Sequence, residues 1–151
     1  MEEKHPNLIV ARKDYTPFPI NAIGLFKPKD LYLLAGIYLS SEYYSDASYL
    51  YTNITVNQLS ALTGVSEDYI SNNFYPRLKR SGFIRYRCIQ EQLLVRRNHF
   101  YLPNPTHNFR FIRKELFFDR TISPEEKGVM IGLYCICING TFRMQEWKSL
   151  L

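Results

Sequence analysis

Cysteine is scarce in this chain of 151 residues, and its three cysteines, Cys88, Cys135 and Cys137, are odd in number. Cys135 and Cys137 are two positions apart on a predicted helix, so their side chains point to different sides of it. No second cysteine pair and no nearby histidine completes the four ligands of a structural zinc site. We therefore interpret the cysteines as buried, reduced thiols and expect no metal and no other cofactor.

Long apolar runs are also missing, because no stretch approaches the roughly 18 residues of a membrane-spanning helix. Residues 1–7 are acidic and lack an apolar signal region, so a cytoplasmic location without a membrane partner is expected. The sequence has no nucleophile elbow, P-loop, carboxylate dyad or metalloprotease motif, and His5, His99 and His107 are scattered. We therefore expect that the protein is not an enzyme.

What is present is enough apolar material for a folded core. Hydrophobic residues make up 46% of the chain, with 12 Tyr and 10 Phe, which argues against disorder. The length suits one domain, or one domain and part of another. The expected fold class is α+β, mainly helical.

Residues 55–81 have the signals of two short helices joined by a tight turn. Thr55 is a candidate N-cap with Gln58 in the capping-box position, and Ser66 is the candidate N-cap of the second helix. Gly64 lies between them, where a left-handed backbone is needed. One buried side is expected to hold Leu59, Leu62, Val65, Ile70, Phe74 and Leu78. The same spacing suits an ordinary helical hairpin inside a core, so spacing alone does not separate the two interpretations.

The second of these helices, expected over 66–81, contains Pro76, which removes a backbone donor. The interval from Ile70 to Leu78 is eight residues, one more than the usual seven. We expect a bulge or kink at Tyr75-Pro76 to absorb the extra residue. Gly82 is the natural stop of the helix.

A β-hairpin is predicted next, with strands over 83–89 and 93–101 and a turn at 90–92. Ile84, Tyr86 and Cys88 alternate with Arg85 and Arg87, so one face of the first strand is apolar and the other basic.

The rest of the chain is expected to divide around these elements. The predicted elements are a strand or arm at 8–13, a break in regular structure at Pro17 and Pro19 near Phe18, a helix over 28–43, a loop at 45–48 and a strand at 49–52. The predicted organisation is an N-terminal arm or strand at 1–26, a first domain at 27–102, a linker at 103–108 and a helical segment at 109–151.

The net charge of +5 is concentrated in one part of the chain. Residues 69–99 hold seven basic residues and one acid, Glu91, and so carry +6, whereas the rest has 12 basic and 13 acidic residues and carries −1. A basic stripe over one helix and the following hairpin is typical of a phosphate-binding surface, although most charge runs are solvated faces. Glu67 and Asp68 suit the start of the helix but would repel a phosphate, so we expect the middle of the helix to lie closest to a nucleic-acid backbone.

An internal repeat links the two halves of the chain. Residues 28–38 (PKDLYLLAGIY) and 124–134 (PEEKGVMIGLY) share Pro, Gly and Tyr at an offset of 96 residues. Residues 142–150 can also be aligned with residues 54–62. This pattern predicts a second domain that begins near residue 109 and stops incomplete at Leu151, as in a truncated product or a fragment; chance similarity between two amphipathic helices is the alternative.

These residues resemble two groups of known proteins. Leu59, Gly64, Val65, Ser66 and Ile70, with Leu78, Gly82 and Ile84 leading into the hairpin, resemble the winged-helix superfamily. Residues 111–129, with Ser123-Pro124-Glu125-Glu126-Lys127-Gly128, resemble the opening of winged-helix domains in plasmid and phage replication proteins and primosome-loading proteins, although Glu126 replaces the small residue often found before that Lys-Gly pair. The resemblance implies a winged helix-turn-helix with a three-stranded wing sheet and a partial second winged helix.

The leading hypothesis is sequence-specific binding of double-stranded DNA by the helix 66–81 in the major groove. Asn72, Tyr75 and Lys79 are expected to face outward, flanked by Ser71, Asn73 and Arg77. Asn72 or Asn73 would read adenine and Arg77 guanine. The phosphates would be held by Arg80, Arg85, Arg87, Arg96 and Arg97.

The biological role implied by the resemblance is replication initiation on a plasmid, phage or other mobile element. A transcriptional regulator and a winged-helix module that binds only proteins are the alternatives. A homodimer is expected, since it would cover exposed apolar surface and suit DNA with two half-sites. A replication or regulatory protein is the other partner considered.

Overall fold

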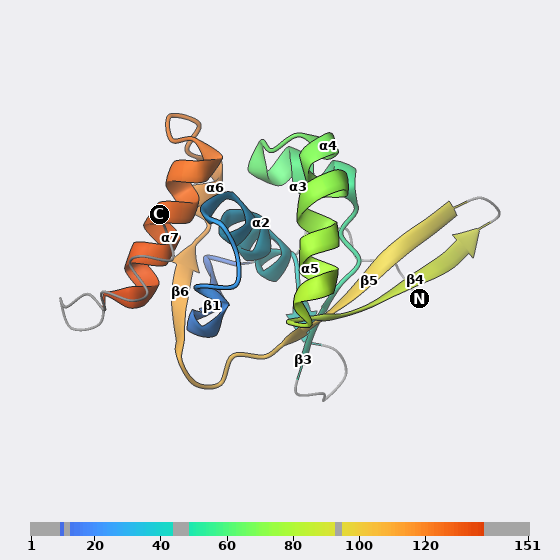
Figure 1. Ribbon diagram of the computed structural model, residues 1–151, viewed down its shortest axis with the longest axis horizontal. Helices are drawn as coiled ribbons and strands as arrows, with labels where there is room; N and C mark the ends of the chain where they lie inside the picture. Colours follow the sequence, from blue (N-terminus) through green and yellow to red (C-terminus); the bar gives the residue numbers. More distant parts are fainter. Residues whose placement is uncertain (1–9, 11–12, 44–48, 93–94, 138–151) are drawn as a thin grey trace.

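The computed structural model describes residue 10 and residues 13–43, 49–92 and 95–137, and for residues 91–92 and 95–96 it describes the backbone alone. The structure is α+β with two antiparallel sheets (Figure 1). In chain order its elements are β1 (Tyr15–Pro19), η1 (Ile20–Ala22), α2 (Pro28–Leu39), β2 (Glu42–Tyr43), β3 (Tyr49–Thr52), α3 (Val56–Thr63), α4 (Glu67–Tyr69), η2 (Ile70–Phe74), α5 (Tyr75–Ser81), β4 (Arg85–Gln92), β5 (Val95–Pro103), β6 (Phe109–Arg113), α6 (Glu115–Phe118) and α7 (Pro124–Ile136). Most of the predicted arm 8–13, the whole of the predicted loop 45–48 and residues 142–150 fall outside the described residues.

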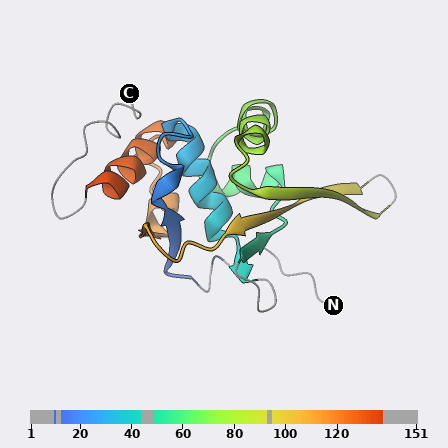
Figure 2. The same cartoon turned by 60° about the horizontal axis from the view of Figure 1, so that its bottom comes forward.

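Helix α2 is the centre of the molecule. Every residue from Asp30 to Leu39 is buried. Figures 1 and 2 show β1, β6 and α7 on one side of α2, and α3, α5 and the larger sheet on the other. Because α2 packs on both sides, it is apolar around most of its circumference and not along a single stripe.

Helix α2 ends earlier than the sequence predicts. It stops at Leu39, and Glu42–Tyr43 form a short strand against Tyr51 and Leu50, so the prediction of a helix to residue 43 is wrong. Two serines account for the early stop. The Ser40 hydroxyl donates to the Ile37 carbonyl and pairs with the Thr52 hydroxyl at 3.0 Å, while the Ser41 hydroxyl donates to the Tyr38 carbonyl. Such local bonds compete with helix continuation.

The predicted helix caps are confirmed. The Thr55 hydroxyl accepts from the Gln58 amide, and the Gln58 side chain accepts from the Thr55 amide, which is a complete capping box. Ser66 caps the second helix by accepting from the Tyr69 amide at 3.2 Å. Gly64 has φ of 76°, in the left-handed region where a side chain would be strained.

The extra residue in the second helix is absorbed as expected, but just before Tyr75-Pro76, the position that the sequence predicts, and not at it. Residues Ile70–Phe74 form a π-helical turn, between the α-helical turns α4 and α5. Pro76 lies in the first turn of α5, where its missing amide is tolerated because the widened turn precedes it. Gly82, with φ of 69°, ends the helix.

The larger sheet has four strands in the order β2-β3-β5-β4, one more than the three-stranded sheet that the sequence predicts. β4 pairs with β5 in register from Arg85 opposite Tyr101 to Gln90 opposite Arg96. The predicted turn at 90–92 is wrong, because β4 continues to Gln92 through an irregularity between Gln90 and Gln92. Residues 90–92 contain no Gly or Asn-Gly pair to favour a tight turn, so they stay extended.

The smaller sheet pairs β1 with β6, from Tyr15 opposite Arg113 to Pro19 opposite Phe109. The predicted break at Pro17 and Pro19 is therefore wrong. Two backbone hydrogen bonds flank β1 at its two ends. The Ile20 amide donates to the Asn108 carbonyl and the Lys114 amide donates to the Asp14 carbonyl, so both bonds involve even-numbered residues of this segment. Hydrogen-bonding groups alternate along a strand, so the odd positions face away from β6 and tolerate proline.

The two copies of the repeat pack against each other. Each consists of a strand, a short helical turn and a helix that begins with proline, and equivalent positions meet at the contact. Thr16 pairs with Ile112 in the small sheet, and Lys29 forms an ion pair with Glu125 at 3.2 Å between α2 and α7. Both pairs are 96 residues apart, as Pro28 and Pro124 are. This arrangement is an approximate local two-fold.

Helix α7 begins with Ser123 as its N-cap. The Ser123 hydroxyl accepts from the Glu126 amide and contacts the Glu126 carboxylate, with Pro124 in the first turn. Further along α7, Met130 and Tyr134 are both 45% exposed, whereas their counterparts Leu34 and Tyr38 in α2 are fully buried. The homodimer and the second winged helix stay predictions. In the part of the chain that the structure describes, no helix is long and apolar enough to cross a membrane.

Candidate nucleic-acid interface

The exposed side of the second helix is formed by consecutive polar residues. Ser71, Asn72 and Asn73 are exposed on the π-helical turn, and Arg80 is exposed near the end of α5, with Lys79 half-buried beside it. The wide turn presents three successive polar side chains to solvent. In an ordinary helix such neighbours would spread around more of the circumference.

Tyr75 does not face outward as predicted. Its side chain is 5% exposed and packs on Phe74 and Phe100, with the ring centroids of Tyr75 and Phe100 5.3 Å apart. Burial raises the pKa of the Tyr75 hydroxyl well above its usual range. The prediction placed Tyr75 by ordinary helical spacing from Ile70, but the π-helical turn rotates the following residues, so both Phe74 and Tyr75 lie inside.

The Tyr75 hydroxyl finds no hydrogen-bond partner among the described residues. We expect Tyr75→Phe to raise the free energy of unfolding by about 1 kcal/mol, because it removes an unpaired buried polar group. Chemical denaturation measures this change. The matched control is Tyr69→Phe, which removes a hydroxyl that donates to Asp30 and should lose about 1.5 kcal/mol. A loss in Tyr75→Phe as large as that in Tyr69→Phe would show that the Tyr75 hydroxyl is bonded.

Arg77 is also not available to read a base. Its Nε donates to Asp30 Oδ2 at 2.8 Å and its Nη2 donates to the Tyr69 hydroxyl at 2.8 Å. The Asp30 side chain is fully buried and that of Arg77 is 33% exposed. The hydrogen bond to Asp30 raises the pKa of Arg77, and burial followed by the hydrogen bond to Asp30 raises the pKa of Tyr69 to about 12. Arg77 therefore anchors α5 to α2.

Two lysines that the sequence did not single out join the same face. Lys29 lies over the Tyr69 ring, with Nζ 4.2 Å from its centroid, and Lys27 is exposed just before α2. The contact of Phe26 with Phe83, at 6.1 Å between centroids, brings this end of α2 beside the end of α5. We call Lys27, Lys29, Ser71, Asn72, Asn73, Lys79 and Arg80 the helix surface.

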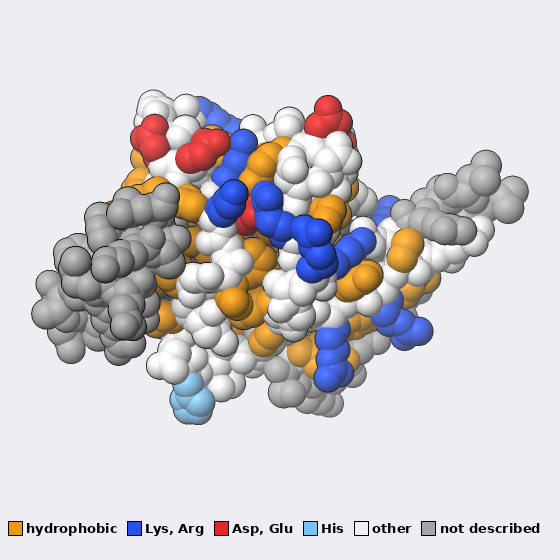
Figure 3. All heavy atoms as spheres, viewed as in Figure 1, with side chains coloured by type: hydrophobic (Ala, Val, Ile, Leu, Met, Phe, Trp, Pro, Cys, Tyr) orange, Lys and Arg blue, Asp and Glu red, His pale blue; other side chains and the backbone are white. Residues whose placement is uncertain are grey.

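Basic and acidic side chains occupy different parts of this side of the molecule. Figure 3 shows Lys and Arg side chains gathered across the middle of the face, with acidic side chains at its upper edge, over α4 and also at the upper left. Glu67 and Asp68, in α4, are exposed. Cationic side chains therefore gather toward the end of α5, and exposed acids lie at the start of the helix.

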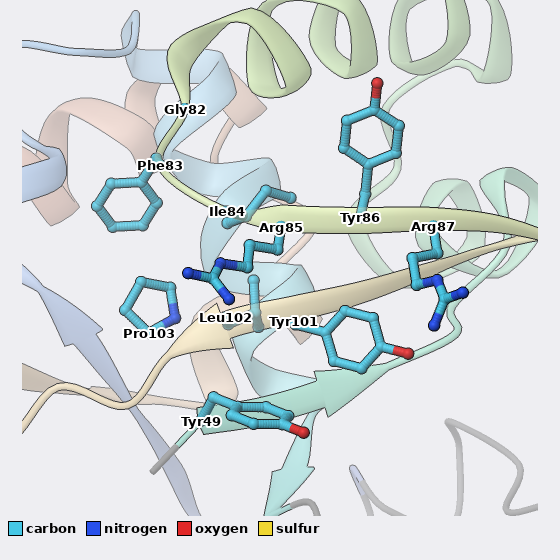
Figure 4. A pocket seen from close by; sticks show the side chains of 10 residues that line it. All are labelled: Tyr49, Gly82, Phe83, Ile84, Arg85, Tyr86, Arg87, Tyr101, Leu102 and Pro103. Carbon is cyan, nitrogen blue, oxygen red and sulfur yellow. The ribbon is translucent and has the colours of Figure 1, made fainter. Parts of the chain in front are cut away.

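The hairpin arginines lie on the other side of the larger sheet. Tyr86 points toward α5, where Lys79 Nζ lies 4.7 Å from its ring centroid. Arg85 and Arg87 flank Tyr86 and alternate with it, so they point to the opposite face, as Figure 4 shows. The prediction of one continuous basic surface over helix and hairpin is therefore wrong for these two residues. Their two exposed guanidinium groups belong to a separate surface.

Of the other predicted phosphate contacts, Arg97 is half-buried in β5 opposite Ile89. Ile89 is two residues beyond Arg87, so Arg97 lies on the same side of the sheet as Arg85 and Arg87. The side chain of Arg96 lies outside the described residues. Of the four predicted phosphate contacts whose side chains the structure describes, Arg80 alone is therefore placed on the helix surface.

Comparison with protein-family models, with curated proteins and with solved structures gave no match to the chain.

Proposed function

We propose that the protein binds double-stranded DNA through the helix surface. The observation that carries the proposal is the row of exposed Ser71, Asn72 and Asn73, which is followed on the same helix by Lys79 and Arg80. Polar side chains that can read base edges are thus flanked by cations that can hold phosphates. The helix is firmly placed for such a role, because the Asp30–Arg77 ion pair anchors it to the central helix.

We further propose that residues 27–102 form a winged helix. The order of elements supports this: a first helix, a short strand, two helices joined by a turn at Gly64, and a two-stranded hairpin. The hairpin pairs with the short strand, β5 beside β3, in one antiparallel sheet. In such folds the second helix of the pair enters the major groove.

In the proposed complex the middle of the helix is closest to the DNA. Asn72 or Asn73 would form a bidentate pair with adenine, which contributes about 1–3 kcal/mol of discrimination. Lys79 and Arg80 would hold phosphates on one flank, and Lys27 would hold a phosphate on the other. Glu67 and Asp68 would keep the start of the helix away from the backbone.

Replication initiation is the biological role we propose, with transcriptional regulation as the alternative. The packing of two strand-and-helix repeats about a local two-fold supports a tandem arrangement, which is what the resemblance to replication initiators implies. Both roles use the same contacts with DNA, so the chemistry of the helix surface does not depend on the choice.

The proposal predicts different effects for the two halves of the helix surface. Lys79→Ala with Arg80→Ala should weaken binding to all duplexes alike and make the log–log salt slope shallower by about 1.8, at about 0.9 per phosphate. Asn72→Ala with Asn73→Ala should lower the preference for a selected site by about 5- to 150-fold and leave binding to random duplexes nearly unchanged. Fluorescence anisotropy with a selected and a scrambled duplex measures both.

The matched control for charge is Arg113→Ala with Lys114→Ala, which removes the same charge at the end of β6. In Figure 1, β6 lies on the other side of α2 from α5. An equal loss of affinity in this control would show that binding is general attraction by net charge. No duplex binding by the unmodified protein would favour the protein-interaction alternative.

A further inference from the structure

The outer face of the larger sheet holds a groove that the helix surface does not use. It has a volume of about 970 Å³, and its lining includes Tyr49, Tyr101, Arg85 and Arg87, which we call the sheet surface. Figure 4 shows both arginines on the same side of the hairpin as the two tyrosines. Three neighbouring strands, β3, β5 and β4, contribute these side chains.

The register of the sheet explains why these residues meet. Arg85 lies opposite Tyr101, and Tyr101 lies opposite Tyr51, so one row across the sheet reads arginine, tyrosine, tyrosine. The row ends at Glu42, opposite Tyr51 in β2. The intervening residues Leu50, Phe100 and Leu102 point to the core and are buried. Alternation therefore sends aromatic and basic side chains together to the outer face.

The tyrosines form one aromatic cluster. The ring centroids of Tyr49 and Tyr51 are each 5.6 Å from that of Tyr101. Tyr51 also holds His99, because its hydroxyl and His99 Nδ1 are 2.6 Å apart. The rings are half-buried and fixed by one another, so stacking a flat ligand on them costs little side-chain entropy.

The charge on this face is graded across the strands. Arg85 and Arg87 are exposed at the β4 edge, whereas Glu42 lies at the far end of the row. An anionic group is therefore favoured above β4, and an uncharged aromatic group above β5 and β3. A nucleotide has both parts, with a phosphate at one end and a flat base at the other.

We propose that the sheet surface binds single-stranded nucleic acid. Bases stack on Tyr101 and Tyr49, and Arg85 and Arg87 hold the adjoining phosphates. Bases in a duplex stack on one another and are not free to stack on a sheet, so the ligand is single-stranded. This site is separate from the helix surface, so the proposal does not depend on whether the protein binds duplex DNA.

The test compares a 20-nucleotide thymidine oligomer with an abasic oligomer of the same length, both fluorescein-labelled, by anisotropy. The two carry the same phosphates and differ in the bases. We expect the thymidine oligomer to bind about 5- to 150-fold more tightly, the range for stacking of one base. A uridine oligomer shows whether the site prefers RNA or DNA, and tight binding of either supports the proposal. Equal affinity for the thymidine, uridine and abasic oligomers would overturn it.

Variants assign the binding to the sheet surface. Tyr101→Leu should lower thymidine-oligomer affinity toward that of the abasic oligomer, and Tyr43→Leu should not, because Tyr43 is an exposed tyrosine on the opposite face of the sheet. Arg85→Ala with Arg87→Ala should weaken both oligomers and make the salt slope shallower by about 1.4, at about 0.7 per phosphate. Because Arg85 and Arg87 are exposed, their replacement should not affect folding. The arginine variant therefore still tests the site if Tyr101→Leu lowers the thermal midpoint. An unchanged slope in the arginine variant would place the binding elsewhere.

Discussion

Replacing Gly128 by alanine is expected to lower the free energy of unfolding by more than about 3 kcal/mol, beyond the usual cost of overpacking. A Cβ at this position would lie 1.7 Å from the carbonyl oxygen of Pro28. The obstacle is the backbone of α2, so no side-chain rotation relieves it. The higher helix propensity of alanine, about 1 kcal/mol, is too small to offset the clash.

Chemical denaturation of the purified variant measures the loss, and Gly36→Ala is the matched control. Gly36 is also a buried helical glycine, but a Cβ there would meet the Leu59 and Thr63 methyl groups at 3.0 and 3.1 Å. Those side chains can shift by a few tenths of an ångström, so a loss of about 1 kcal/mol is expected. Equal losses in the two variants would contradict the close backbone contact between α2 and α7.

Replacing Arg77 by alanine is expected to lower the free energy of unfolding by about 3 kcal/mol, the lower end of the range for breaking a buried ion pair. The variant leaves the fully buried Asp30 carboxylate with Tyr69 alone. The lower end applies because the Arg77 side chain is 33% exposed, so water already screens part of the interaction. For a chain of this size, the thermal midpoint should fall by roughly 6–12 °C.

Two controls separate the buried charge from other effects of the substitution. Arg80→Ala removes an exposed arginine on the same helix and should change stability by no more than about 0.5 kcal/mol. Asp30→Asn combined with Arg77→Met removes both charges and should recover most of the stability. A double variant as unstable as Arg77→Ala would show that the loss comes from packing and not from an unpaired carboxylate.

Local signals in the sequence predicted local structure well. The capping box at Thr55, the N-cap at Ser66 and the glycines that end the helices at 64 and 82 depend on residues within one or two turns. One extra residue between Ile70 and Leu78 predicts an irregularity in the second helix, and the structure has one, a π-helical turn that ends just before the predicted position at Tyr75-Pro76. These features follow from short-range geometry, which the chain specifies directly.

Features that depend on distant partners were predicted poorly. Pro17 and Pro19 predict a break in regular structure, because proline cannot donate a backbone hydrogen bond. Nothing near them in the sequence shows that their positions point away from the partner strand, which lies more than 90 residues later. The sequence predicts that Arg77 contacts a base. Its true partner, Asp30, is 47 residues away and no local pattern points to it. Lys27 and Lys29 were missed for the same reason, since only the packing of α2 beside α5 brings them to the helix surface.

The placement of the basic residues divides one expected surface into two. A single stripe in the sequence, residues 69–99, supplies Lys79 and Arg80 to the helix surface and Arg85 and Arg87 to the sheet surface. The change occurs at Gly82, where the chain leaves α5 and enters β4. The sequence predicts five phosphate contacts with one duplex. The helix surface can make about three, so charge counted along the sequence overstates the number.

The salt dependence of duplex binding by the unmodified protein tests the central claim most directly. With Lys27, Lys79 and Arg80 each neutralising one phosphate, a plot of log affinity against log salt concentration should have a slope of about −2.7. Anisotropy titrations of one labelled duplex over a range of salt concentrations give this slope. A slope near zero, or no measurable binding at low salt, would contradict duplex binding by the helix surface.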